Sequence, residues 1–92
     1  MPQVEVKFYA SLKEKLGKDV VSLKAENVKE AIELLKDKLG ENFSRWVLEK
    51  DGSLKNYYIL IVNERIVDKK NLINTKLKDK DILHIFPPIA GG

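Results

Sequence analysis

The part of this sequence best suited to chemistry is its final segment, Phe86-Pro87-Pro88-Ile89-Ala90-Gly91-Gly92. Glycines carry no side chain, so a backbone that ends in two of them can enter a narrow channel and approach a reactive centre closely. Pro87-Pro88 favours an extended backbone that would leave a folded domain stiffly. Six extended residues reach about 20 Å. We therefore predict a protruding tail at 87–92, and a frayed terminus is the alternative interpretation.

Side chains that usually carry catalysis are scarce. The sequence contains no cysteine, which excludes a disulfide, a thiolate zinc site and a cysteine nucleophile. His84 is the one histidine and cannot form an imidazole metal site by itself. Glu30 and Glu33 share a predicted helix face, but lysines surround them, so a solvated surface is favoured over an acid–base pair. No metal site is predicted.

Charge and hydropathy narrow the class of partner. The 17 basic and 14 acidic side chains give a net charge of +3. Neither half of the chain is a basic arm, so direct binding of nucleic acid is not expected. The longest apolar stretch, Tyr57–Val62, is far shorter than the roughly 20 residues that span a membrane. Glu5 and Lys7 interrupt the first apolar segment, which argues against a secretory leader. These features favour a cytoplasmic protein without a membrane partner.

The elements that must position the tail are mostly strands. Alternation and β-branched composition predict them at Val4–Ala10, Asp19–Lys24, Tyr57–Val62, Arg65–Val67 and Ile82–Phe86. Because Tyr57–Val62 is apolar throughout, we expect a central strand that is buried on both faces. In the last strand, alternation places Leu83 and Ile85 on one face, and Ile82, His84 and Phe86 on the other.

Two helices are predicted from their capping patterns. Ser11–Glu14 has the spacing of a capping box, and the short helix that it opens ends at Gly17. A second box, Asn27–Glu30, opens the main helix, whose apolar stripe continues to Gly40. Residues 41–56 are predicted to be an irregular or briefly helical connection.

One main helix requires one sheet face to cover its apolar stripe, so the fold class is α+β, a roll with a mixed sheet packed on that helix. A chain of 92 residues has room for a single domain, 1–92. The predicted core comprises Val4, Val6, Phe8, Ile32, Leu35, Ile59 and Ile61.

Several segments give the whole chain a family likeness. They are Val6-Lys7-Phe8-Tyr9-Ala10-Ser11-Leu12, Val62-Asn63, Asp79-Lys80-Asp81 and, above all, the tail from Phe86 to Gly92. Together they resemble the MoaD/ThiS sulfur-carrier family, which consists of ubiquitin-like proteins that end in Gly-Gly. The resemblance implies a ubiquitin-like β-grasp fold. The family often has glycine where this chain has Glu64 and Lys80, so these two turns can differ in type.

The resemblance is most specific to the small subunit of molybdopterin synthase, and it implies a cycle at Gly92. A ubiquitin-activating-type enzyme would adenylate the Gly92 carboxylate with ATP, and a sulfur donor would then displace AMP to leave a thiocarboxylate. The large subunit of molybdopterin synthase would use that sulfur to build the dithiolene of molybdopterin. The resemblance also implies a carrier that binds no cofactor and is not an enzyme by itself, because the catalytic side chains belong to its partners.

The resemblance places Gly91 and Gly92 at the reactive end of the carrier. It assigns contact with the partner proteins to five preceding residues: Phe86, Pro87, Pro88, Ile89 and Ala90. In the alternative interpretation, both faces of the strand Ile82–Phe86 are buried in the core, and Phe86 contacts no partner. Three other functions remain open: a carrier for tRNA thiolation, a protein modifier whose Gly92 forms isopeptide bonds with lysines, and a binding module with an inert tail.

Overall fold

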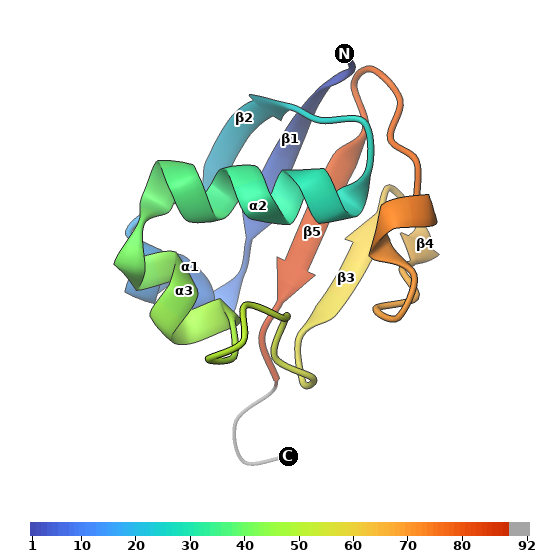
Figure 1. Cartoon of the computed structure of the whole chain (residues 1–92). Helices are drawn as coiled ribbons and strands as arrows, with labels where there is room; N and C mark the ends of the chain where they lie inside the picture. Colours follow the sequence, from blue (N-terminus) through green and yellow to red (C-terminus); the bar gives the residue numbers. More distant parts are fainter. Residues whose placement is uncertain (89–92) are drawn as a thin grey trace.

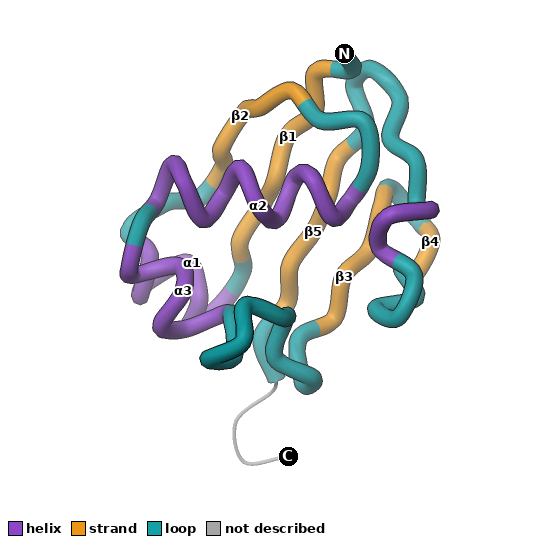
Figure 2. Tube along the Cα trace, viewed as in Figure 1, coloured by secondary structure: helices purple, strands orange, loops and turns teal. Residues whose placement is uncertain are grey.

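The computed structural model describes residues 1–88, which form the predicted α+β roll, a ubiquitin-like β-grasp (Figure 1). The elements in chain order are β1 (Gln3–Phe8), α1 (Ala10–Leu16), β2 (Val20–Lys24), α2 (Val28–Leu39), α3 (Glu41–Val47), β3 (Ile59–Val62), β4 (Arg65–Ile66), the 3-10 helix η1 (Leu72–Asn74) and β5 (Ile82–Phe86). Helix α2 crosses one face of the sheet, and α1 and α3 lie together beyond its C-terminal end (Figure 2). Within residues 1–88, no helix is both long enough and apolar enough to cross a membrane.

The sheet is mixed, as predicted, with the strand order β2-β1-β5-β3-β4. Strands β1 and β5 are parallel, and every other neighbouring pair is antiparallel. Strand β5 therefore lies at the centre of the sheet, hydrogen-bonded on both sides. The strand that leads to the predicted tail is thus an interior strand of the sheet, with a neighbour on each side.

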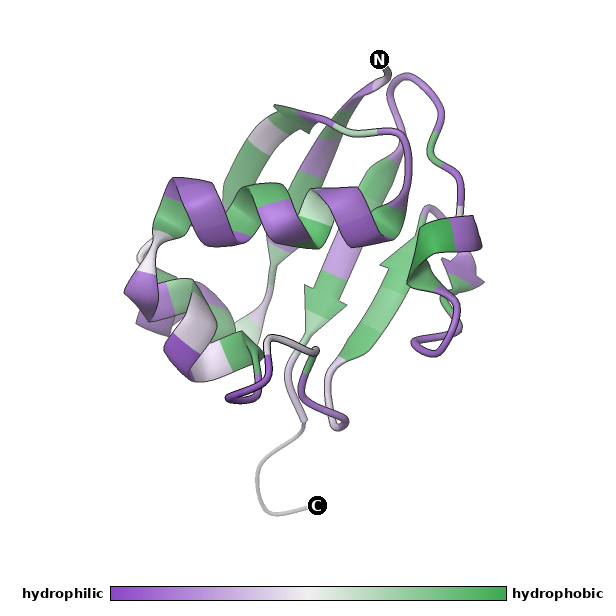
Figure 3. Ribbon diagram, viewed as in Figure 1, coloured by the Kyte–Doolittle hydropathy of each residue, from purple (hydrophilic) through white to green (hydrophobic). Residues whose placement is uncertain are grey.

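The core lies between α2 and the sheet face beneath it. Figure 3 shows apolar residues along the strands and on the side of α2 that faces them. Phe8, Leu35, Leu60, Leu83 and Ile85 are fully buried there. Burying one such side chain stabilises the fold by about 1.5–3 kcal/mol. The predicted burial of Val4, Val6, Phe8, Ile32 and Leu35 is confirmed.

The prediction for β3 is wrong in one respect. Leu60 and Val62 are buried, whereas Ile61 is half-buried and the side chain of Ile59 is 46% exposed. The strand is thus buried on one face. The reason is that α2 covers a single face of the sheet, and no second layer covers the other face within residues 1–88. An apolar run without alternation cannot reveal which of its two faces is covered.

The caps of α2 follow the prediction. The side chain of Asn27 accepts a hydrogen bond from the backbone N–H of Glu30 at 2.8 Å, and the Glu30 carboxylate accepts one from the N–H of Glu26 at 2.9 Å. Gly40 ends α2 at a positive φ of 71°. Helix α3 then follows at once, so the connection after α2 begins with a helix before it becomes irregular.

The capping box predicted for α1 does not form. The N-cap residue is Tyr9, whose backbone is extended, and no side chain caps this helix. Because β1 continues in extended form through Tyr9, the helix begins at Ala10 and takes Ser11 into its first turn. The predicted stop at Gly17 is confirmed by its left-handed φ of 66°.

The two turns in which the resembled family often has glycine behave differently. Lys80 has a φ of 73°, in the region that glycine favours. The turn is held by the Asp79 carboxylate, which accepts from the N–H of Gln3 at 2.9 Å, and by the N–H of Lys80, which donates to the Gln3 carbonyl at 2.8 Å. In the other turn the residue with a positive φ is Asn63, at 56°.

Candidate functional site

The predicted tail begins where β5 leaves the sheet. Phe86, the last residue of β5, pairs with Ile59 of β3, and it is followed by a buried Pro87 and an exposed Pro88. The remaining predicted site residues, Ile89, Ala90, Gly91 and Gly92, lie outside the described residues. The structure therefore places the base of the predicted tail at the end of the central strand.

An aromatic cluster lies beside this point, on the sheet face opposite α2. The hydroxyl oxygen of Tyr9 lies 2.6 Å from Nδ1 of His84. The ring of Tyr9 stacks on Phe86 with centroids 4.2 Å apart and planes inclined by 15°. We name Tyr9, His84 and Phe86 the aromatic cluster. It connects the loop after β1 with the strand that leads to the tail.

Three isoleucines, two exposed and one half-buried, extend the cluster across β3 and β4. Ile59 lies opposite Phe86, and Ile61 lies opposite both His84 and Ile66. The side chains of Ile59 and Ile66 are 46% and 78% exposed. We name these three isoleucines and the aromatic cluster the outer face. Adjacent exposed apolar side chains of this kind mark interaction surfaces in soluble proteins.

The alternation predicted for β5 is confirmed. Leu83 and Ile85 are buried, while Ile82, His84 and Phe86 are half-buried on the outer face. The alternative, that both faces of β5 belong to the core, is wrong because α2 covers the side of Leu83 and Ile85 only.

The environment of His84 disfavours its charged form. Burial is the larger cause and the positive charge of Lys7 the smaller, and both lower the pKa of His84 below its usual value. Lys7 is the residue of β1 that pairs with His84 in the sheet. A neutral imidazole can accept the hydrogen bond from the Tyr9 hydroxyl, so the cluster combines an apolar surface with one satisfied polar pair.

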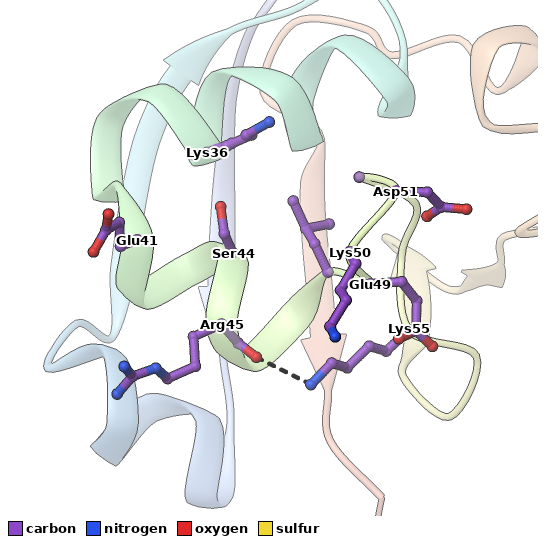
Figure 4. Close-up of a pocket in the computed structure, with 10 residues that line it drawn as sticks. Lys36, Glu41, Ser44, Arg45, Glu49, Lys50, Asp51 and Lys55 are labelled. Carbon is purple, nitrogen blue, oxygen red and sulfur yellow. Dashed lines mark hydrogen bonds between the residues drawn. The ribbon is translucent and has the colours of Figure 1, made fainter.

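A separate groove of about 630 Å³ lies between α2, α3 and the loop that follows α3 (Figure 4). Its lining mixes basic and acidic side chains, which include Lys36, Arg45, Glu41 and Asp51. The ammonium group of Lys55 donates to the backbone carbonyl of Arg45 at 3.0 Å. Alternating charges of both signs select no single class of ligand. Nor do the described residues contain a group of three or more histidine, aspartate or glutamate side chains that could hold a metal.

Sequence reasoning missed two features of this site. Tyr9 and His84 are separated by 75 positions, so no local pattern predicts their contact. That Ile59 is exposed and Ile61 only half-buried depends on which sheet face α2 covers. The alternation of β5 did predict that His84 and Phe86 share one face of the strand. It could not predict that Tyr9 and the isoleucines lie on the same face.

Comparison with known proteins identifies a matching family and several similar structures. The family model described as the ThiS family matches residues 6–92. A search of curated proteins found no match. The solution structure of small archaeal modifier protein 1 from Methanosarcina acetivorans is 28% identical, with a TM-score of 0.80, and the match covers 100% of this chain and 98% of that one.

Two further similar structures are complexes of proteins. One is the complex of subunits 1 and 2 of the molybdopterin-converting factor from Helicobacter pylori; its matching chain is 29% identical, with a TM-score of 0.68, over 98% of this chain and 99% of that one. The other is the BexX/CysO complex of Amycolatopsis orientalis, at 26% identity and a TM-score of 0.77, over 97% of this chain and 99% of that one. A protein of this shape therefore occurs in assemblies with a second subunit.

Proposed function

Because this chain belongs to the ThiS family of ubiquitin-like sulfur carriers, we propose that it carries sulfur on the carboxyl group of Gly92. In the first step an adenylating enzyme transfers AMP from ATP to the Gly92 carboxylate and releases pyrophosphate. In the second step a sulfide equivalent attacks the acyl carbon and expels AMP, which leaves a thiocarboxylate. The carboxylate is first made into an acyl adenylate because the free anion is a poor electrophile with no good leaving group.

The observation that carries this proposal is the family match, which extends through Gly91-Gly92 to the last residue of the sequence. The fold supports it, because β5 is hydrogen-bonded on both sides and directs the chain to an exposed Pro88 at the base of the tail. A rigid base limits the region that the acyl end can reach. Such positioning matters because displacements of about 1 Å already impair reaction rates.

The outer face is the surface on which we place the docking of the adenylating enzyme. It lies next to the base of the tail and exposes apolar side chains that α2 leaves uncovered. Phe86 belongs to both regions, since it ends β5 and stacks on Tyr9. A partner that covers this face would hold the tail at the entrance to its own active site.

The sulfur acceptor that we favour is the precursor of molybdopterin, with this chain as the small subunit of molybdopterin synthase. The likeness to the H. pylori molybdopterin-converting factor supports this assignment, since that structure contains both subunits. In this role the catalytic side chains belong to the large subunit, and the chain itself binds no cofactor.

A second candidate is protein modification, which the likeness to small archaeal modifier protein 1 supports. A neutral lysine amine would then attack the carbonyl carbon of the Gly92 acyl adenylate and expel AMP, which forms an isopeptide bond. Transfer of sulfur to tRNA would use the same thiocarboxylate and a different acceptor.

The first experiment is to incubate the chain that ends at Gly92 with ATP, a sulfide source and its cognate adenylating enzyme, and to measure its intact mass. We expect a mass gain that corresponds to the replacement of one oxygen by sulfur. A matched chain with alanine added after Gly92 should gain nothing. An unchanged mass, under conditions in which the enzyme activates another carrier, would refute the carrier function.

The second experiment distinguishes the three proposed pathways by their products. The thiocarboxylate form is mixed with the synthase large subunit and the molybdopterin precursor, and dithiolene formation is measured. Lysine-linked conjugates in cell extract, without dithiolene formation, would instead assign the chain to protein modification. Thiolated tRNA as the product would assign it to the third pathway.

A further inference from the structure

Lys7 brings a positive charge to the side of the sheet that carries the outer face. It pairs with His84 across the neighbouring strands β1 and β5, which lie about 4.7–4.9 Å apart (Figure 1). Val6 and Phe8, the residues on either side of it, are buried in the core. Because successive side chains of a strand alternate, Lys7 lies on the same face as His84. Its side chain is half-buried there, beside the aromatic cluster.

No carboxylate in the described part of the chain pairs with this charge. The one ion pair among residues 1–88 joins Lys13 to Asp19, at 3.8 Å. Glu5 lies on the same face of β1, two positions before Lys7, but the two side chains form no ion pair. Covering an unpaired charge with an apolar surface costs free energy, because the charge loses its water. A partner that covers Lys7 is therefore favoured if it brings a negative charge to this point.

Tyr9 determines which nitrogen of His84 can donate to a partner. The hydroxyl oxygen of Tyr9 lies 2.6 Å from Nδ1. Hydroxyl donors form hydrogen bonds of about 2.5–3.0 Å and N–H donors form bonds of about 2.7–3.2 Å, so the hydroxyl is the donor and Nδ1 the acceptor. Burial and the charge of Lys7 favour the neutral imidazole. A neutral imidazole that accepts at Nδ1 carries its ring proton on Nε2.

The Nε2–H group of His84 is in contact with solvent. No hydrogen bond joins Nε2 to another group of residues 1–88. The same residues contain no buried side-chain nitrogen or oxygen atom without a hydrogen-bond partner, so Nε2 cannot be a buried atom. A partner that displaces water from this group must supply an acceptor, because a buried donor without one is costly.

We propose that Lys7 and His84 together bind a carboxylate of the adenylating enzyme. The Lys7 ammonium group and the Nε2–H of His84 would donate to it from two adjacent strands. A backbone carbonyl could accept the Nε2–H bond, but it would leave the charge of Lys7 unpaired. This assignment rests on the function proposed above, in which the outer face is the docking surface of that enzyme, and it adds the chemistry of one contact within that surface.

Such a contact would give the outer face a means of selecting its partner. Around His84 the face consists of apolar side chains, those of Phe86, Ile59 and Ile61. Apolar side chains alone discriminate weakly between partners of similar shape. Two adjacent donors reject a surface that lacks the carboxylate, because docking would then leave both of them buried and unpaired.

The test measures the affinity of full-length variants for the cognate adenylating enzyme by surface plasmon resonance, with thermal melts to verify folding. His84→Leu should weaken binding about tenfold, because it replaces the donor by an apolar side chain. His84→Gln should bind nearly as tightly as the wild type, since its amide keeps an acceptor for Tyr9 and a donor for the carboxylate. An interface that is only apolar predicts the reverse order, with His84→Leu the tighter of the two.

Lys7→Gln should also weaken binding about tenfold and reduce its dependence on salt. Lys50→Gln is the matched control, because Lys50 is exposed and lies on the loop after α3. In the double variant Lys7→Gln/His84→Leu the loss should be smaller than the product of the two single losses, since both side chains contact one carboxylate. ATP–pyrophosphate exchange should show a raised KM with an unchanged kcat, as expected for residues that bind the enzyme and do not react.

Tight binding by His84→Leu would refute the proposal, and Lys7→Gln decides the matter if that variant does not fold. Weakening by His84→Leu with no change in Lys7→Gln would indicate a neutral acceptor and likewise overturn it. A wild-type dimer that Lys7→Gln dissociates would assign the two residues to a second copy. If the wild type is neither bound nor adenylated, the proposed function fails and this contact with it. If both single variants are adenylated at the wild-type KM, only the contact is refuted.

Discussion

The hydroxyl oxygen of Tyr9 lies 2.6 Å from Nδ1 of His84, although 75 positions separate the two residues. This contact joins the loop after β1 to the central strand β5, two residues before Phe86. The Tyr9 ring also stacks on Phe86. Tyr9 therefore contacts both aromatic residues of β5, His84 and Phe86, in the strand that leads to the tail.

Tyr9→Phe should lower the free energy of unfolding by about 1 kcal/mol, because it removes the hydrogen bond and keeps the ring. Urea denaturation measures the change. Tyr57→Phe is the matched control, since Tyr57 is exposed and its hydroxyl has no hydrogen-bond partner among the described residues. Equal stability of the two variants would show that the Tyr9–His84 bond contributes nothing net.

The unfolding free energy should fall as the pH is lowered from 7 to 5. Burial and the charge of Lys7 lower the pKa of His84 in the folded state. The unfolded chain therefore binds a proton more readily, and the stability that neutral His84 contributes is lost as the pH falls below about 6.5. His84→Gln should reduce this dependence.

Lys7→Gln should raise the pKa of His84, because it removes the smaller of the two causes that lower it. An NMR titration of the imidazole protons in both proteins measures the difference. Lys55→Gln is the control with the same loss of charge and should leave the pKa of His84 as it is. An unchanged value in Lys7→Gln would exclude Lys7 as a cause.

Phe86→Ala should weaken the affinity for the adenylating enzyme more than tenfold, if the outer face is its docking surface. Truncation of an aromatic residue at the centre of an interface commonly costs 2 kcal/mol or more. Surface plasmon resonance measures the affinity, and a thermal melt confirms folding. Ile73→Ala is the control, because Ile73 is 53% exposed but lies on η1, away from the outer face. Unchanged affinity in Phe86→Ala would remove Phe86 from the interface.

Gly91→Val should abolish thiocarboxylate formation while leaving the melting temperature unchanged. A β-branched side chain restricts the backbone and cannot enter a channel shaped for glycine. Deletion of Gly92 should have the same result, because it withdraws the carboxylate by about 3.3–3.6 Å. ATP–pyrophosphate exchange and intact mass measure the two steps. Normal thiocarboxylate formation without Gly92 would contradict its assignment as the reactive residue.

Lys80→Gly should raise the free energy of unfolding by about 1 kcal/mol. A left-handed backbone costs a non-glycine residue about 1–2 kcal/mol, and the greater entropy of glycine in the unfolded chain offsets part of the gain. Urea denaturation tests this, with Lys78→Gly in the same loop as the control. Lys78 has no positive φ, so its replacement should destabilise. A loss of stability in both variants would show that φ at Lys80 carries no strain.

Local signals in the sequence determined much of the fold. The Asn27 cap, the stops at Gly17 and Gly40, and the alternation of β5 each depend on residues within one turn of a helix or a few positions of a strand. The prediction of a tail rests on two similarly local signals, Pro87-Pro88 and Gly91-Gly92, and the structure describes only the prolines. Such patterns can be recognised in the sequence because backbone preferences and the alternation of side chains depend on neighbouring residues.

Only the tertiary structure decided which surfaces the protein presents. The apolar run that became β3 has no period of its own, so the position of α2 determined that Leu60 is buried and Ile59 exposed. Tyr9 meets His84, and β2 becomes an unpaired edge, because strands distant in sequence pair in one particular order. These contacts join residues dozens of positions apart, and a short sequence window contains only one partner of each.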